Sequence, residues 1–383
     1  AAARRAQDTV PVVNATAFAA FSFPWQLKAA TDSLVVVVKA TCDLQADGPA
    51  RLRSQADPAS GDLHDGGDAA RTLAYASDFA VFKPRADVTL VGHAYAPGGS
   101  SQAAQAQLRF GSKKSGFERR IAVFGERRWK KAGIKLVPEA PKPFKKVPLT
   151  WERAFGGPTF EKNPSGVGIA GDLLPQLEDP TSLVTSPNDT PEPACFAGMP
   201  PRWGLRRAFL GTFDAAWKKS RWPYFPDDFD WSFFQAAPAA QQLEHLAGDE
   251  TFELVGVHAD HPVIRGRLPG VRPRCFAQKT GDLGGDLHEV LLRLDTVAFE
   301  PDRMMVTLVW RGVIDVVDET AEDVAELFVL EEKLAGPAID RAEALSKYTA
   351  AKLPPAPAEV APGSGAGAGS VVARAGAGSV VAA

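Results

Sequence analysis

The pattern of apolar and polar residues predicts β-strands in two regions of the chain. Residues 34–44, LVVVVKATCDL, open with five apolar β-formers and then alternate, which is typical of a strand covered on both faces at its start. The pair Asp47-Gly48 predicts a tight turn, after which residues 50–55 return as the paired strand. Further strands are expected at residues 87–95, 105–111 and 117–124.

The second region contains the clearest hairpin. Every second residue from Val290 to Ala298 shares a face, and the alternation resumes from Met304 to Arg311. The pair Pro301-Asp302 supplies the turn between the two runs. The two regions, about 10–150 and 250–316, therefore predict a mainly β (β-rich α+β) fold built from antiparallel sheet layers. We favour one large unit, because no linker-like stretch separates them.

The segment between these regions, residues 151–250, has little periodicity and many aromatic residues. Of the 34 aromatic residues of the chain (8 Trp, 4 Tyr and 22 Phe), 11 lie between Trp203 and Phe234. Large rings cover much apolar surface and can hold an irregular segment rigid, so we expect them to pack across the β core. The alternative is that some of these rings are anchors on a partner-binding face.

A helical period follows the hairpin. The sequence TAED at 320–323 resembles a capping box, and four apolar residues from Val324 to Leu334 then fall on one helical face. The pair Gly336-Pro337 ends this helix and starts another that reaches about Leu353. We therefore expect a helical extension over 317–353. Residues 354–383 are repetitive and rich in Ala and Gly, which predicts a linker or disordered tail.

The charge pattern gives no support to nucleic acid or membrane as a partner. The formal net charge is -3, no apolar run is long enough to span a membrane, and no known RNA-binding or zinc-finger pattern is present. Residues 113–146 nevertheless contain 12 Lys or Arg and three Glu, whereas residues 318–332 contain seven acids and no base. We expect these runs to be solvated or to neutralise each other, and the functional alternative is a basic face for an acidic protein partner.

The three cysteines are widely spaced, which indicates reduced thiols with packing roles and a cytoplasmic protein.

The candidate catalytic groups are weak. His258, Asp260 and His261 form the only dense histidine group, but they precede a proline in a predicted loop and lack a third metal ligand. The motifs HExxH, GxSxG and GxxxxGK[ST] are absent, and NPSGVG at 163–168 lacks the Lys and the Ser/Thr that hold phosphate and metal. We therefore expect no cofactor and no enzyme activity.

The stretch PLTWERAFGG at 148–157 admits two interpretations. Glu152 beside Arg153 could supply an acid or base, but no second carboxylate or histidine stands at a recognisable spacing. The structural interpretation is stronger: Trp151 and Phe155 anchor to the core, and Gly156-Gly157 let the chain reverse. We expect a structural joint that shapes a docking surface, with the two charges paired near the surface.

Several motifs spread over residues 10–316 resemble one bacterial family. They include KPRADVTLVGHAY, ERAFGG followed by NPSGVG, and PDDFDWSFFQAAPAAQ. They identify the chain as a member of domain-of-unknown-function family 2169, which is encoded beside type VI secretion spike and effector genes. Cys42 stands where the family has a Phe-like residue, and residues 185–201 and the C-terminal extension are not family hallmarks.

The resemblance implies an adaptor or chaperone that binds a secreted effector and helps load it onto a spike of VgrG or PAAR type. The alternatives are a hydrolytic or metal-dependent enzyme using Glu152 or the His258 group, a nucleic-acid binder through residues 113–146, and a structural component of the spike or baseplate. The candidate partner-binding residues are Trp151, Glu152, Arg153, Phe155, Gly156, Gly157, Asn163, Pro164, Gly166, Gly168, Trp217, Trp222, Tyr224, Phe225, Phe229 and Trp231.

Overall fold

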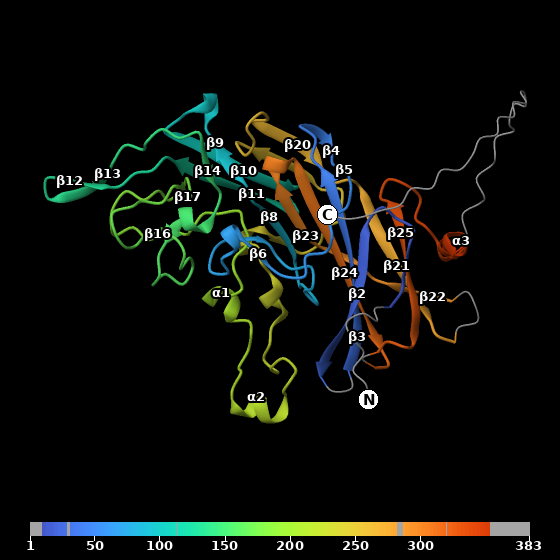
Figure 1. Cartoon of the computed structure of the whole chain (residues 1–383). Helices are drawn as coiled ribbons and strands as arrows, with labels where there is room; N and C mark the ends of the chain where they lie inside the picture. The colour runs from blue at the N-terminus through green and yellow to red at the C-terminus, as the bar shows by residue number, and fades with distance from the viewer. Residues whose placement is uncertain (1–9, 29–30, 113, 282–285, 319, 353–383) are drawn as a thin grey trace, which may run out of the picture.

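Strands and irregular segments dominate the computed structural model, as the sequence predicts for a mainly β protein (Figure 1). The structure describes residues 10–28, 31–112, 114–281, 286–318 and 320–352. The predicted tail at 354–383 lies outside these residues. No helix of the described residues is long and apolar enough to cross a membrane.

The largest sheet contains the two segments with the clearest strand patterns, the hairpin and the Val-rich strand. The predicted hairpin is confirmed, although a bulge between Leu294 and Thr296 interrupts its alternation. The Val-rich strand lies beside it and is buried along nearly its whole length. The order is β18 (Gln242–Leu243), β8 (Ala86–Leu90), β23 (Arg293–Glu300), β24 (Met305–Val316), β3 (Thr31–Asp43) and β2 (Ala19–Lys28), with β5 (Arg51–Leu52) also paired to β3.

A second sheet packs against the first. The ring of Phe299 in β23 contacts Phe110 and Phe252 of the second sheet at centroid distances of 6.1 and 5.0 Å. All three side chains are almost fully buried, so these rings are part of the inter-sheet core. The order is β17 (Leu177–Glu178), β11 (Gly116–Phe124), β10 (Ala103–Gly111), β19 (Thr251–Val255), β20 (Val263–Arg267) and β4 (Asp47–Pro49).

The predicted turn at Asp47-Gly48 is wrong in detail. These residues form β4, which pairs in parallel with β20 of the second sheet. Only Arg51 and Leu52 of the expected return strand pair with β3. The chain thus crosses between the two sheets, and each large sheet takes strands from both the first 150 residues and the region after 250.

A third sheet corrects the predicted helix at 324–334. This segment is strand β25. Its side chains alternate as in a strand: Leu327 and Val329 face the main core, and Phe328 and Leu330 face α3 on the other side. The TAED sequence forms a turn rather than a helix cap, with Ala321 at φ 51°. The sheet order is β1 (Val12–Asn14), β25 (Val324–Lys333), β21 (Val271–Lys279) and β22 (Leu287–Val290).

The second predicted helix is confirmed as α3 (Arg341–Lys352). Asp340 accepts a hydrogen bond from the backbone N–H of Glu343, as an N-cap does. Ala344 and Tyr348, one turn apart, bury the inner face against Phe328 of β25. The C-terminal extension is therefore one strand and one helix instead of two helices.

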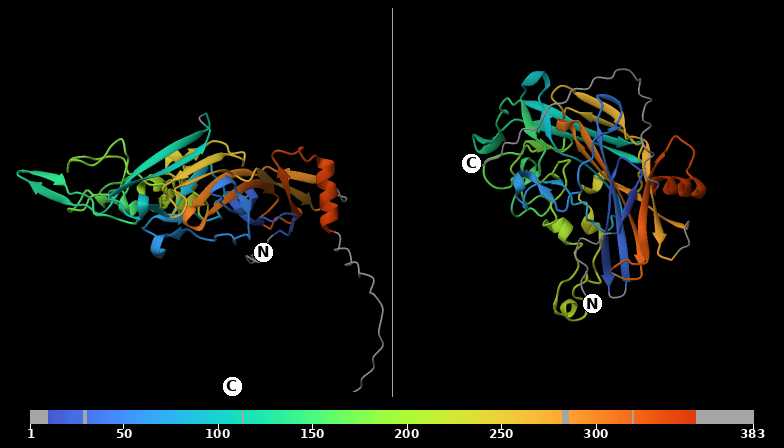
Figure 2. Two further views of the ribbon diagram at one scale, coloured as in Figure 1. Left: turned by 90° about the horizontal axis from the view of Figure 1, so that it is seen from above. Right: turned by 45° about the vertical axis from the view of Figure 1, so that its right-hand side comes forward.

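Short elements fill the remaining segments, and most of residues 151–250 is irregular as expected. The β12–β13 hairpin and α3 lie at opposite ends of the molecule (Figures 1 and 2). The short pairs are β6 (Leu63–His64) with β7 (Leu73–Tyr75), β9 (His93–Tyr95) with β14 (Lys146–Pro148), β12 (Trp129–Ala132) with β13 (Lys135–Pro138), and β15 (Phe155–Gly156) with β16 (Val167–Gly168); the short helices are α1 (Gly204–Arg207) and α2 (Ala215–Ser220).

Candidate partner-binding surface

The WER sequence at 151–153 forms a single 3-10 turn whose charges are used within the fold. The carboxylate of Glu152 accepts hydrogen bonds from the backbone N–H and the hydroxyl of Thr72, both at 2.8 Å. The hydroxyl oxygen of Thr72 in turn accepts from the backbone N–H of Trp151 at 2.8 Å. Arg153 donates to the side-chain oxygen of Gln176 at 2.6 Å. Glu152 is therefore a structural acceptor for a segment 80 residues away in the sequence.

Asn163 ties the two glycine-rich loops together. Its side chain is fully buried and donates to the carbonyl oxygens of Trp151 at 2.8 Å and Phe155 at 3.0 Å. Phe155 and Gly156 pair with Val167 and Gly168 in the short parallel ladder β15–β16. The ERAFGG and NPSGVG motifs are thus the two halves of one joint.

This geometry makes a prediction at Gly156. A Cβ atom there would lie 2.2 Å from the backbone oxygen of Asn163, a contact that real Cβ atoms do not make. We expect Gly156→Ala to lower the free energy of unfolding by about 1–3 kcal/mol, because the backbone of the joint has to shift. Urea denaturation measures the change. Gly61→Ala is the matched control, since a Cβ at Gly61 meets nothing within 4 Å, and equal stability of the two variants would contradict this account.

The candidate residues divide by exposure. The buried ones present almost no surface to a partner in this conformation, so they contribute by fixing the backbone that shapes the surface. The buried set is Trp151, Phe155, Gly156, Gly157 and Asn163; the half-buried set is Glu152, Pro164, Gly166, Gly168, Trp217, Tyr224, Phe225, Phe229 and Trp231; the exposed set is Arg153 and Trp222.

A second buried network joins two other motifs. Asp87 accepts hydrogen bonds from the ammonium of Lys83 at 2.9 Å, from the side-chain amide of Gln235 at 2.7 Å and from the backbone N–H of Ala236 at 2.8 Å. Lys83 and Asp87 are nearly fully buried. The KPRADV and FFQAA sequences are therefore locked together, which places the aromatic segment against the largest sheet.

The inner rings of the aromatic segment pack on that sheet, as one of the two interpretations requires. Phe225 stacks on Phe229 at 4.1 Å and lies 5.2 Å from Trp25 of β2. Trp231 meets Phe229 and Phe82 edge-on at 5.3 and 6.0 Å. These rings cover the outer face of β2 and β3, where Val35 and Val37 of β3 also lie.

The outer rings lie on a projecting arm. Residues 210–229 form this arm, which is closed at its base by the hydrogen bond from Asp230 N–H to Phe209 oxygen at 2.9 Å and carries α2 at its tip (Figure 1). At the tip Trp217 contacts Phe213 at 4.7 Å and Trp222 at 5.5 Å, both edge-on. Phe213 is 49% exposed and Trp222 is 66% exposed. The arm therefore presents preorganised aromatic surface to solvent.

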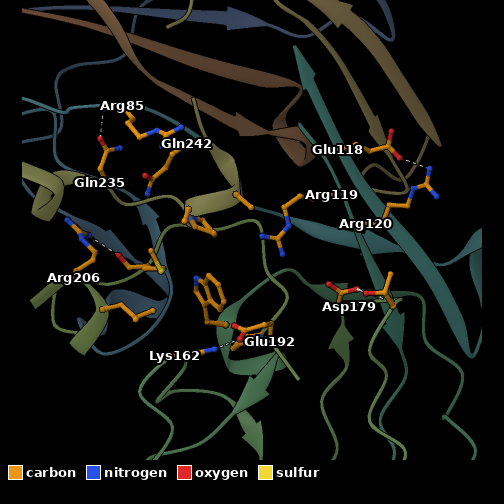
Figure 3. A pocket seen from close by; sticks show the side chains of 18 of the residues that line it. Arg85, Glu118, Arg119, Arg120, Lys162, Asp179, Glu192, Arg206, Gln235 and Gln242 are labelled. Carbon is orange, nitrogen blue, oxygen red and sulfur yellow. Dashed lines mark hydrogen bonds and ion pairs between the residues drawn. The ribbon is translucent and has the colours of Figure 1, made fainter. Parts of the chain in front are cut away.

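A groove of about 1210 Å³ lies beside the base of the arm (Figure 3). Its walls come from β10 and β11, from α1, and from the irregular segments 179–193 and 232–242. Leu205 of α1 and Phe209 at the base of the arm are both partly exposed there. The sequence-based candidates include only one residue of this groove, Trp151, so the groove itself was missed.

The basic run 113–146 pairs locally. Lys142 contacts Glu126 at 2.8 Å, Arg128 contacts Asp172 at 2.8 Å, and the buried Arg127 pairs with Glu178. The acidic run lies at the other end of the molecule, where Glu332 pairs with Arg272 and Arg274, Asp323 with Lys279, and Glu326 with Lys352. Mutual neutralisation of the two runs is therefore wrong for the described residues.

The other chemical candidates are part of the fold. His258 accepts hydrogen bonds at Nδ1 from the backbone N–H groups of Asp260 and His261, both at 3.1 Å, and orders the turn. Among the described residues no group of three or more His, Cys, Asp or Glu is placed to hold a metal ion. Burial raises the pKa of Cys42, Cys195 and Cys275 to about 12, so these thiols are protonated and pack as small apolar side chains.

A family model describes most of this architecture. Residues 29–311 match "Uncharacterized protein conserved in bacteria (DUF2169)", which covers both large sheets apart from β2 and the end of β24. The chain belongs to this family. No curated protein and no solved structure matched the chain.

Proposed function

We propose that this protein is an effector adaptor of a type VI secretion system, which holds a secreted protein in the cytoplasm and delivers it to a VgrG- or PAAR-type spike. The aromatic arm carries this proposal. Exposed Trp and other large aromatic rings are favoured as binding anchors, since they bury much area and lose little conformational entropy. The rings at the tip are held in place by one another, so a partner meets a surface that is already ordered.

The internal organisation of the family motifs supports a binding role. The motif residues Trp151, Asn163 and Asp87 are buried and make hydrogen bonds that fix backbone segments to one another. Their common effect is to hold the aromatic segment and the groove in place. A scaffold that positions an exposed surface is what an adaptor needs.

The test is affinity capture of the tagged protein from its host bacterium in low and moderate salt, with mass spectrometric identification of the bound proteins. Recovery of a toxin-like effector together with a spike component is the expected result. Recovery of neither class in either salt condition contradicts the adaptor function.

The arm is tested with the double variant Phe213→Ala/Trp222→Ala. We expect capture of the effector to fall at least about tenfold, because hot-spot rings each contribute roughly 2 kcal/mol or more to binding. The melting temperature should stay close to the wild-type value, since the Phe213 and Trp222 side chains are 49% and 66% exposed.

The matched control is Ile134→Ala/Leu136→Ala on the projecting β12–β13 hairpin. This control also removes two exposed apolar side chains, but at a different place on the surface. Full capture by the arm double variant, or an equal loss with the control, would show that the arm is not the binding face.

A further inference from the structure

The groove contains a guanidinium group, that of Arg119, which forms no direct ion pair within the described part of the chain. Arg119 extends from β11 into the cavity (Figure 3), and its side chain makes no hydrogen bond or ion pair with the described residues, although its backbone pairs with β10. Burial lowers the pKa of Arg119, and the attraction of Asp179 opposes that shift. The Asp179 carboxylate already accepts two hydrogen bonds from Thr181, from the backbone N–H at 2.8 Å and from the hydroxyl at 2.6 Å.

The groove as a whole carries an excess of positive charge. Five bases and three acids line it, a difference of +2. Arg120 pairs with Glu118, and Lys162 pairs with Glu192, so these four charges cancel within the wall. The remaining charged side chains are Arg85, Arg119, Arg206 and Asp179.

Arg206 adds fixed positive charge at the far wall. Its guanidinium donates to the carbonyl oxygens of Met199 at 2.8 Å and Phe233 at 2.7 Å instead of to a carboxylate. Its side chain is buried, and burial lowers its pKa. A partly desolvated cation that lacks a full counterion is unfavourable in the free protein and attracts an anionic group into the groove.

The dimensions and lining of the groove fit a chain segment. Its volume of about 1210 Å³ exceeds the range of roughly 300–1,000 Å³ that is usual for small-molecule sites. Leu205, Phe209, Met199 and several prolines and alanines supply apolar contacts along it. A peptide segment can place apolar side chains on these contacts and a charged side chain on the arginines at the same time.

We propose that this groove binds an extended segment of a partner protein and that an Asp or Glu side chain of the segment forms a bidentate ion pair with Arg119. Such a pair uses two parallel hydrogen bonds and is stronger than a neutral contact. The groove meets the aromatic arm at Phe209. One partner can therefore occupy the groove and reach the rings of the arm. The identification of the partner as the secreted client rests on the adaptor function proposed above.

The experiment selects binders from a phage-displayed library of random 12-residue peptides on the purified full-length protein. Selected sequences are synthesised with an N-terminal fluorescein and a C-terminal amide. The amide removes the terminal carboxylate, so within the peptide sequence only Asp and Glu side chains carry one. Fluorescence polarisation then measures their Kd for the wild type and for Arg119→Gln, Arg119→Lys and Arg109→Gln. Arg109 is the matched control, because it lies on the neighbouring strand β10, pairs with Glu253 and does not line the groove.

We expect the selected peptides to share an Asp or Glu between apolar residues. Arg119→Gln should weaken binding about ten- to a hundredfold, the size usual for a hydrogen-bonded charge pair. Arg119→Lys should have a smaller effect, since lysine keeps the positive charge but cannot make the two parallel hydrogen bonds of a guanidinium group. Arg109→Gln should bind like the wild type. Replacing the acidic residue of the peptide by Asn or Gln should have little further effect on Arg119→Gln, because the two changes remove the same contact.

Peptides without a shared acid, acidic peptides that bind Arg119→Gln as tightly as the wild type, or a selection without binders each overturn the groove proposal. Acetate at millimolar concentration is a further test. If it displaces the labelled peptide as well as an unlabelled selected peptide does, the groove proposal is overturned, because a free carboxylate is then sufficient for binding. A result that overturns the groove proposal does not contradict the adaptor function if effector capture depends on the arm. Conversely, Arg119-dependent peptides with no effector captured support the groove and contradict the adaptor function.

Discussion

Asp87→Ala is expected to lower the free energy of unfolding by about 3–5 kcal/mol. The substitution leaves the Lys83 ammonium buried without a counterion, and breaking a buried ion pair from one side costs that much. It also removes the acceptor of the backbone N–H groups of Ala236 and Ala237. Urea denaturation followed by circular dichroism measures the loss.

Two further variants show whether the unpaired charge is the cause. Lys83→Met/Asp87→Ala should recover part of the stability lost in Asp87→Ala, because neither charge then remains. Asp227→Ala removes an exposed carboxylate that pairs with Arg221, and it should leave the unfolding midpoint unchanged. A loss below about 1 kcal/mol in Asp87→Ala would show that the Lys83–Asp87 network does not hold the fold together.

Trp151→Ala should also cost about 3–5 kcal/mol, the range for deleting a large buried aromatic side chain. The indole ring is 3% exposed, packs edge-on against Trp203 at 5.4 Å, and donates to the carbonyl oxygens of Ala197 at 3.1 Å and Gly198 at 3.0 Å. The change leaves a cavity and removes the indole donor from the Ala197 oxygen, whereas the Gly198 oxygen still accepts from the backbone N–H of Leu73 at 3.2 Å. The measurement is urea denaturation beside a thermal melt.

Trp222→Ala is the matched control, since it deletes the same side chain from a site that is 66% exposed. We expect wild-type stability and weakened effector capture from Trp222→Ala. For Trp151→Ala we expect the reverse, a large loss of stability and a smaller effect on effector capture. If Trp151→Ala and Trp222→Ala lower the free energy of unfolding equally, the division between a buried joint and an exposed arm is wrong.

Local pattern was sufficient for the strands with strong alternation. The late hairpin is predictable because side chains alternate across a strand whatever its neighbours are, and the 34–44 run because consecutive Val residues favour a strand covered on both faces. The alternation in β11 also bears on the groove, because Arg119 shares a face of this strand with the buried Ile121 and Val123. An arginine on that face is directed inward, and this was the one local signal for the groove.

The error at 324–334 came from burial on two faces. Four consecutive apolar residues, 327–330, are as compatible with one face of a helix and its neighbours as with a strand between two layers. The strand forms because β1 and β21 supply ladder partners and α3 covers the outer side. Neither ladder partner is a sequence neighbour of β25, although α3 directly follows it.

The sequence by itself determined the β-rich class, the Val-rich strand, the hairpin, the C-terminal helix and the family. It also predicted a structural joint at PLTWERAFGG from its glycines and anchoring rings, whereas the structure showed that NPSGVG is the other half of that joint. Only the tertiary structure decided which rings are exposed, which residues line the groove and which charges lack a partner. These properties depend on segments such as β11, α1 and residues 179–193, which are far apart in the chain and meet only after the sheets have assembled.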